Sequence, residues 1–318
     1  MSDVLSCVLP GVGFDRSTQG LLGAGQRLAR ELGGKHIVAV LGAADTGEIA
    51  KCCDSVLSAG HAALAEYQPE TCLQALKALG EQSGAGVVLL GNDTYSQELT
   101  PRLAHRLGGC SIPDAQELSV QDGKVQVSRS VYGGKAMAHV APNKTPAVVW
   151  VRARAMEPAE AGSAADVQQV DLELADSAAV RIVERHVEAQ EGVRLEYAEV
   201  IVSGGRGLGG PEPFELLKQL AGPMKAQVAA SRAACDSGWV PPNWQVGQTG
   251  KKVAPELYLA VAISGASQHL MGIADAKVIA AINTDADAPI YKHCRYGLVE
   301  DYKNAVEPLR EKLAALLS

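Results

Sequence analysis

The sequence predicts an α/β protein built from two α/β domains with mainly parallel sheets. Short, continuously apolar runs alternate along the 318-residue chain with amphipathic stretches of helical spacing, as expected for strands buried between helical layers. Hydrophobic residues make up 47% of the chain and aromatic residues only 4%, which favours packed α/β layers over an all-β sandwich. The length accommodates two domains, which we expect at residues 1–190 and 191–318.

The first half alternates between apolar strands and amphipathic helices that end in Gly-Gly. We expect strands at 6–9, 36–42 and 86–92, helices at 21–34 and 96–109, and further strand-like segments at 123–140 and 146–155. Residues 156–179 are rich in Ala, Glu, Asp and Ser without a sustained period, so they are predicted to form a partly extended connection between the domains. A weak alternation at 181–188 predicts an edge strand.

The second half repeats the strand–loop–helix order. Apolar strands are expected at 199–203, 227–230, 257–263 and 277–283, with a short crossover helix between the last two. The segment that begins at Val306 predicts a C-terminal helix with Pro308 in its first turn. Leu309, Leu313 and Leu316 would form the apolar stripe of that helix.

A glycine-rich loop follows the first strand of the second half. Gly205, Gly207 and Gly210 match the G-x-G-x-x-G pattern of dinucleotide-binding loops, and a predicted helix follows them. The acidic residue expected about twenty positions later is not clearly present, which weakens a nicotinamide interpretation. Two alternatives stay open at this point: an NAD(P)-dependent enzyme that uses this loop, and a glycine turn needed only for close packing.

The segment VGQTGK, residues 246–251, looks like the end of a phosphate-binding P-loop. The P-loop pattern fails at two of its fixed positions, since its first glycine is replaced by Gln245 and its Ser or Thr by Lys252. Five loops, at 203–210, 231–238, 246–251, 264–269 and 283–287, would nevertheless follow strand ends at one edge of one sheet. Ligands of open α/β sheets bind at that edge.

Composition excludes several classes of function. A net charge of −7 and few aromatic residues argue against nucleic acid as the main partner. Seven cysteines without a Cys-x-x-Cys motif argue against a disulfide framework or a zinc site, and no metal ligand set is expected. We expect no signal peptide, no transit sequence and no membrane insertion. The predicted location is the bacterial cytoplasm, or the mitochondrial matrix for a processed eukaryotic chain.

The stretch from Ser231 to Ile290 closely resembles the alpha subunit of electron-transfer flavoproteins. Its specific motifs are V-G-Q-T-G-K, S-G-A-S-Q-H and A-I-N, and the resemblance extends over essentially the whole chain. The resemblance implies a Rossmann-like FAD-binding domain in the second half. It also implies that the family commonly has glycine where Ala262 stands and a bulky aliphatic residue where Ser267 stands.

The resemblance further implies which residues bind FAD. Those facing the pyrophosphate and its sugars would be Arg206, Ser231, Ser264, Gly265 and Asn283. Gln248 and Gln268 would reach the ribityl chain, and Asp301 and Tyr302 the adenosine end. Thr249 would lie near flavin N5, Arg232 beside the ring, and His269 near the N1–C2 carbonyl edge. The set is completed by Val246, Gly247, Ala266 and Ser267.

The implied function is that of an electron carrier in a heterodimer, without a substrate of its own. Domain one would dock a beta subunit that holds AMP. Electrons would arrive from flavin dehydrogenases, such as those of fatty-acid oxidation, and leave to a membrane quinone oxidoreductase. A fixed guanidinium at Arg232 and a hydrogen-bonding imidazole at His269 would stabilise the charge that flavin gains on reduction. A regulatory module that has lost the flavin is a third interpretation.

Overall fold

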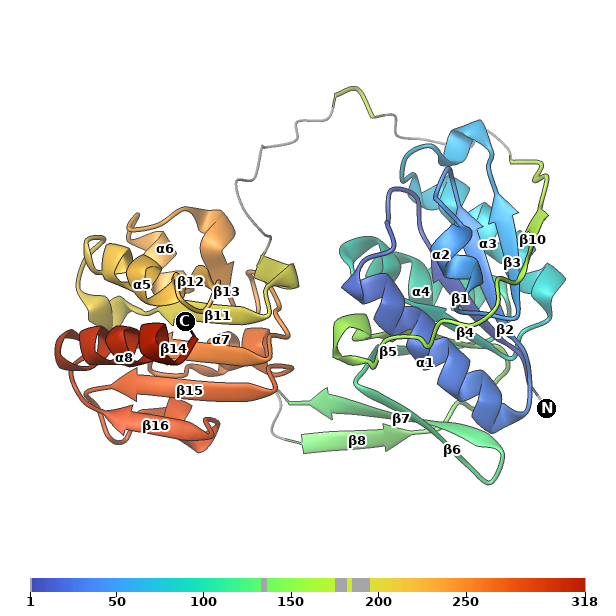
Figure 1. The fold of residues 1–318 in the computed structure, drawn as a ribbon. Helices are drawn as coiled ribbons and strands as arrows, with labels where there is room; N and C mark the ends of the chain where they lie inside the picture. Colours follow the sequence, from blue (N-terminus) through green and yellow to red (C-terminus); the bar gives the residue numbers. More distant parts are fainter. Residues whose placement is uncertain (1, 133–135, 175–181, 185–194, 318) are drawn as a thin grey trace. The chain divides into compact units, whose positions relative to one another are not determined.

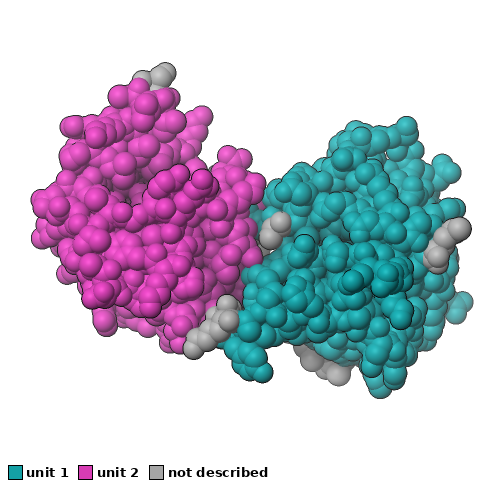
Figure 2. Space-filling view, turned by 90° about the horizontal axis from the view of Figure 1, so that it is seen from below, with its two compact units in different colours: residues 1–185 teal, residues 186–318 magenta. Residues whose placement is uncertain are grey.

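The computed structural model describes residues 2–132, 136–174, 182–184 and 195–317 (Figure 1). The chain divides into two compact units, residues 1–185 and 186–318, which Figure 2 colours separately. The domain boundary predicted at residue 190 lies outside the described residues. The predicted α/β class is confirmed, because the main sheet of each unit consists of parallel strand pairs.

Unit 1 contains a seven-stranded sheet in the order β10-β3-β2-β1-β4-β9-β5. Its strands are β1 (Val4–Val8), β2 (His36–Leu41), β3 (Ser55–Ala59), β4 (Val87–Leu90), β5 (Cys110–Ala115), β9 (Ala147–Val151) and β10 (Asp166–Gln169). A smaller antiparallel sheet consists of β6 (Glu117–Gln121), β7 (Lys124–Val131) and β8 (Ala136–Val140). The helices are α1 (Arg16–Leu32), α2 (Gly47–Ala50), α3 (Pro69–Ser83) and α4 (Thr94–Arg106), with 3-10 turns η1 (Ala62–Leu64) and η2 (Ala153–Ala155).

Helices cover both faces of the large sheet, as continuous apolar strands require. The side chains of α3 and α4 pack against one face. Those of α1, α2 and the small sheet pack against the other. Helix α1 ends where predicted, since Gly33 takes the left-handed conformation at its C-terminus, with φ of 65°.

Two sequence predictions need correction here. Residues 166–169, predicted to belong to a connection between domains, form strand β10, which pairs with β3. All four side chains of β10 are exposed, so the strand is formed by backbone pairing at a sheet edge rather than by burial. Of the edge strand predicted at 181–188, residues 182–184 form no strand and the others lie outside the described residues.

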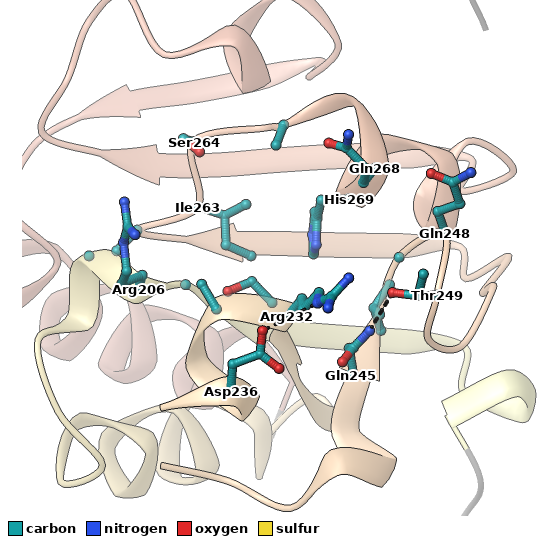
Figure 3. Close-up of a pocket in the computed structure, with 18 of the residues that line it drawn as sticks. Arg206, Arg232, Asp236, Gln245, Gln248, Thr249, Ile263, Ser264, Gln268 and His269 are labelled. Atoms are coloured by element: carbon teal, nitrogen blue, oxygen red, sulfur yellow. Dashed lines mark hydrogen bonds and ion pairs between the residues drawn. The ribbon is translucent and has the colours of Figure 1, made fainter. Parts of the chain in front are cut away.

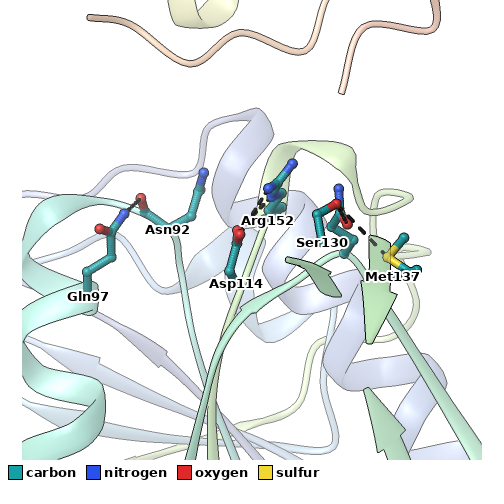
Figure 4. Close-up of polar contacts among 7 residues, drawn as sticks. Asn92, Gln97, Asp114, Ser130, Met137 and Arg152 are labelled. Carbon is teal, nitrogen blue, oxygen red and sulfur yellow. Dashed lines mark hydrogen bonds and ion pairs between the residues drawn. The ribbon is translucent and has the colours of Figure 1, made fainter. Parts of the chain in front are cut away.

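An ion pair joins the ends of two strands in unit 1 (Figure 4). Arg152, which follows β9, donates from Nε and Nη2 to the two carboxylate oxygens of Asp114 on β5, at 2.6 and 3.0 Å. Asp114 has a φ of 61° and lies where the pairing of β5 with β9 shifts register. The bidentate pair therefore supports a backbone conformation that is unfavourable for a residue other than glycine.

Unit 2 contains a six-stranded parallel sheet in the order β13-β12-β11-β14-β15-β16. Its strands are β11 (Val200–Gly204), β12 (Gln227–Ser231), β13 (Gln245–Val246), β14 (Leu257–Val261), β15 (Val278–Asn283) and β16 (Tyr296–Val299). Its helices are α5 (Pro213–Ala221), α6 (Arg232–Asp236), α7 (Ser267–Ile273) and α8 (Tyr302–Leu317), with 3-10 turns η3 (Leu195–Tyr197), η4 (Arg206–Leu208), η5 (Pro242–Trp244) and η6 (Pro289–Lys292). Helices α5, α6 and α8 pack on one face, and α7 and η6 on the other.

The C-terminal helix differs from the prediction in its start and in its apolar stripe. Helix α8 begins at Tyr302, so Pro308 lies inside the helix rather than in its first turn. Leu309 and Leu313 pack against the core, whereas Leu316 is 80% exposed. The hydroxyl of Tyr302 donates to the carbonyl of Leu208 at 2.9 Å, and this buried contact fixes the start of the helix.

Candidate functional site

The order of the unit 2 strands creates a crevice at one edge of the sheet. Numbered along the chain, the strands lie in the order 3-2-1-4-5-6 of the doubly wound nucleotide-binding fold. Strands β11 and β14 are adjacent, and the chain leaves them in opposite directions across the sheet. Loops that follow such a pair diverge and leave space at the carboxyl ends of the strands.

A cavity of about 670 Å³ occupies that edge (Figure 3). Its volume is in the range of small-molecule and cofactor sites, about 300–1,000 Å³. Its walls come from the five loops predicted to meet there. Twelve of the predicted cofactor-binding residues line it: Arg206, Ser231, Arg232, Val246, Gly247, Gln248, Thr249, Ser264, Ala266, Gln268, His269 and Asn283.

Four predicted residues do not line the cavity. Gly265 and Ser267 belong to the loop after β14, but that loop presents other residues to the cavity. The hydroxyl of Tyr302 makes its hydrogen bond within the core. The carboxylate of Asp301 accepts a hydrogen bond from the amide of Lys303 at 3.0 Å. The structure therefore assigns Asp301 and Tyr302 a role in starting α8, and their contact with an adenosine stays a prediction.

Backbone approaches at two glycines shape the loops around the cavity. A side chain at Gly205 would place its Cβ 2.0 Å from the carbonyl oxygen of Ala262, so only glycine lets the loop after β11 meet β14. Gly265 has a φ of 83°, and a Cβ there would lie 2.5 Å from the amide nitrogen of Ile290. The glycine-rich loop after β11 therefore serves close packing, which was one of the two alternatives, and its residues Gly205 and Gly207 also line the cavity.

The charged side chains that line the cavity are two arginines and two aspartates, Asp236 and Asp285. Arg206 lies at the loop after β11 and makes no ion pair among the described residues. Arg232 starts α6 and pairs with Asp236 one turn later, with Nε 3.2 Å from the carboxylate oxygen. Because both partners are about two-thirds exposed, this pair is weak and Arg232 can turn towards a ligand.

The segment VGQTGK bends around the cavity without using its lysine there. Lys251 pairs with Glu196 and does not line the cavity. Gln245 donates to the hydroxyl of Thr249 at 3.0 Å, and the amide of Gln248 donates to the carbonyl of Gln268 at 2.7 Å. The segment therefore presents Val246 to Thr249 to the cavity, and a P-loop role for its lysine does not fit.

His269 lies on α7 at the inner wall of the cavity (Figure 3). Only 7% of its surface is exposed, and its Nε2 lies 3.0 Å from the hydroxyl of Tyr258 on β14. Burial lowers the pKa of His269 to about 4, although the backbone of Val246 acts in the opposite direction. The imidazole is therefore neutral near pH 7, and the positive charge of the cavity comes from its arginines.

Two buried polar atoms on the cavity wall have no hydrogen-bond partner among the described residues. They are Oγ of Ser231 and Nδ1 of His269. Leaving such atoms unpaired costs roughly 1–3 kcal/mol each, so native structures nearly always give them a partner. Both atoms belong to residues of a wall that also carries two arginines and three glutamines. The residues present therefore fit a large polar ligand with anionic and carbonyl oxygens.

Eight lining residues were not in the predicted cofactor-binding set: Gly205, Gly207, Ala233, Asp236, Gln245, Ala262, Ile263 and Asp285. Asp236 follows Arg232 at helical spacing, which was the available signal for their ion pair. Asn283 lines the cavity as predicted, but its amide donates to the carbonyl of Ile263 at 3.0 Å and its oxygen accepts from the amide of Asp285. Asn283 thereby joins the ends of β14 and β15.

Other kinds of site find little support in the part of the chain that the structure describes. No group of three or more His, Cys, Asp or Glu side chains is placed to hold a metal ion there. Within the same residues, no helix is long and apolar enough to cross a bilayer. A nicotinamide site usually has a carboxylate at the end of the second strand; here β12 ends in Ser231.

Two family sequence models match the chain. Residues 12–176 match the electron transfer flavoprotein domain, and residues 194–274 match the electron transfer flavoprotein FAD-binding domain. The second match spans the loops after β11, β12, β13 and β14, which form most of the cavity wall.

The relatives that the chain resembles are named electron transfer flavoprotein subunit alpha or FixB. The chain is 35% identical to "Protein FixB" of Clostridium saccharobutylicum over 94% of this chain and 92% of that protein. It is 37% identical to the electron transfer flavoprotein subunit alpha of Bacillus subtilis over 83% of this chain and 81% of that protein. The subunit alpha of Pseudomonas aeruginosa is 40% identical over 87% of each chain.

Proposed function

The chain belongs to the electron transfer flavoprotein alpha-subunit family, and from that premise we propose that the cavity of unit 2 binds FAD. The protein then carries electrons between other redox proteins and has no substrate of its own. One observation carries the proposal: Ser231 and His269, whose buried Oγ and Nδ1 have no hydrogen-bond partner among the described residues, line a cavity formed mostly by the segment that matches the FAD-binding domain.

The residues of the cavity have separate tasks in this proposal. Bound flavin supplies the ability to take up and return electrons. Arg206 and the loop at Ser264 bind the anionic phosphate groups, since guanidinium and backbone N–H groups are suited to phosphate oxygens. Arg232 provides positive charge that Asp236 partly offsets. His269, neutral and buried, provides a hydrogen bond without a charge.

The partners follow from the family and from the proposed redox role. An alpha subunit implies a beta subunit as partner, and we assign unit 1 to that contact and AMP to the partner. Flavin dehydrogenases, such as acyl-CoA dehydrogenases of fatty-acid oxidation, would donate electrons, and a quinone oxidoreductase would accept them. All seven cysteines are free, which supports a reducing compartment such as the bacterial cytoplasm or the mitochondrial matrix.

The proposal is tested on the chain purified together with its partner subunit. We expect a yellow assembly that releases FAD on heating in an amount equimolar to this chain. Arg206→Ala should weaken FAD binding about tenfold or more, because hydrogen bonds to charged groups are worth roughly 1.5–3 kcal/mol. Arg310→Ala is the matched control, since Arg310 lies on α8 and pairs with Glu307 away from the cavity.

Two outcomes would contradict the proposal and favour one of the alternatives. An assembly that binds nicotinamide and turns over a small substrate would favour the NAD(P)-dependent enzyme. A colourless assembly that added FAD cannot reconstitute would favour the module without flavin.

A further inference from the structure

A buried tyrosine lies directly behind the cavity wall. Tyr258 on β14 is the largest side chain in unit 2 with no exposed surface, and it lies within an otherwise apolar cluster. A phenol hydroxyl buried in such surroundings is costly unless it is hydrogen-bonded. Its partner is Nε2 of His269, at 3.0 Å, and His269 is itself one of the residues that line the cavity.

A second buried hydroxyl lies near Tyr258. Ser203 on β11 has no exposed surface, and its strand pairs with β14 so that Ile201 lies opposite Tyr258. Ser203 is two residues further along β11, on the same face of the sheet, where a diagonal contact with a long side chain is possible. Its hydroxyl acts to lower the pKa of the Tyr258 phenol, which places it nearby, but it makes no hydrogen bond among the described residues.

The buried phenol gives its contact with His269 a direction. Among the described residues, Nε2 of His269 is the hydrogen-bond partner of the Tyr258 hydroxyl, so the phenol hydrogen has an acceptor when Tyr258 donates to Nε2. In the reverse direction the hydrogen of Tyr258 would have no such acceptor, which costs roughly 1–3 kcal/mol for a buried group. A neutral imidazole that accepts at Nε2 must carry its hydrogen on Nδ1.

The surroundings of Nδ1 agree with this direction. The backbone of Val246 lies beside His269 and favours a proton on the ring, which is the effect of a nearby carbonyl oxygen on an N–H group. The contact falls short of hydrogen-bonding geometry, so Nδ1 has no partner of its own. The N–H group is therefore available to an acceptor that enters the cavity.

We infer that Tyr258 is a positioning residue that holds His269 as the neutral Nδ1–H tautomer and so makes it a fixed hydrogen-bond donor to an acceptor oxygen of the ligand. The inference rests on the proposed function only in naming that oxygen, which would be a carbonyl of the flavin ring. A donor held in place before the ligand arrives needs no reorganisation when negative charge develops on the acceptor. Tyr258 does not line the cavity, so it acts through His269.

The first experiment does not require a bound ligand. The complete assembly, freed of flavin and labelled with ¹⁵N-histidine, is studied by NMR near pH 7, and the resonances of His269 are assigned from their loss in His269→Gln. We expect the hydrogen on Nδ1 in the wild type. In Tyr258→Phe we expect loss of the single tautomer. Hydrogen on Nε2 in the wild type, or an unchanged tautomer in Tyr258→Phe, overturns the inference.

The second experiment measures FAD affinity and the midpoint potential of bound FAD in the same variants. Tyr258→Phe should weaken binding about fivefold, the equivalent of one ordinary hydrogen bond, and make the potential more negative. Tyr67→Phe is the matched control, because it removes a tyrosine hydroxyl of unit 1 that donates to Glu98 at 3.0 Å; it should change neither quantity. Equal effects of both variants would overturn the role of Tyr258. An assembly that binds no FAD would contradict the proposed function instead, while the NMR result still decides the tautomer.

Discussion

Acidification should destabilise unit 2 through His269, by an amount that follows from the burial of this residue. An unfolded histidine has a pKa near 6.5, whereas burial lowers the pKa of folded His269 to about 4. Below pH 6.5 the unfolded chain binds a proton that the folded unit does not, so stability falls as pH decreases. The loss begins near pH 6.5 and is complete below about pH 4.

The size of the effect is the difference between the two pKa values multiplied by the free energy per pKa unit. A difference of about 2.5 units at 1.36 kcal/mol per unit gives roughly 3 kcal/mol. The assay is urea unfolding of the flavin-free assembly, compared between wild type and His269→Gln from pH 7 to pH 4. The difference isolates His269, because the other titrating groups are common to both proteins.

We expect the stability of the wild type relative to His269→Gln to fall by roughly 3 kcal/mol over that range, with most of the change between pH 6 and pH 4.5. A difference that stays constant within about 0.5 kcal/mol would refute the reasoning. His36 repeats the test in unit 1: burial lowers its pKa to about 4, and its Nε2 lies 2.9 Å from the hydroxyl of Ser6. His36→Gln should therefore show an acid-dependent difference of its own.

Three further predictions concern charge, backbone strain and the C-terminal helix. Arg232→Ala should make the potential of the first one-electron reduction of bound FAD about 40 mV more negative, since an exposed charge at contact distance is worth about 1 kcal/mol; an unchanged potential on stepwise reduction counts against its role. Ala262→Gly should stabilise unit 2 by up to about 1 kcal/mol in urea unfolding, because Ala262 has a φ of 55°, and clear destabilisation would show that its methyl contacts matter more. Leu309→Ala should destabilise unit 2 by more than 1 kcal/mol, whereas Leu316→Ala should change stability by less than about 0.5 kcal/mol; equal effects would contradict the observed packing of α8.

Much of the fold could be predicted because its strands are buried on both faces. Strands β2 and β4 are completely buried, so each is a continuous apolar run that can be recognised from the sequence alone. Strand β10 could not be found in this way, because its four exposed residues carry no apolar period and its pairing with β3 alone makes it a strand. The start of α8 was missed because Pro308 looked like a first-turn residue.

The sequence predicted which loops form the candidate site, but only some of the side-chain contacts within it. Parallel strands place their following loops at one edge, so the five loops followed from the strand assignment. The ion pair of Arg232 with Asp236 and the contact of Tyr258 with His269 depend on which way side chains turn. A tyrosine within the apolar run Leu257–Val261 was a usable signal, because a buried phenol needs a hydrogen-bond partner.

The most direct test of the account is a crystal structure of the assembly purified with its native ligand. Difference density should show FAD in the cavity of unit 2, with its phosphates near Arg206 and Ser264 and a ring oxygen within hydrogen-bonding distance of Nδ1 of His269. Density for a nicotinamide cofactor there, or for FAD bound elsewhere on this chain, would contradict the account.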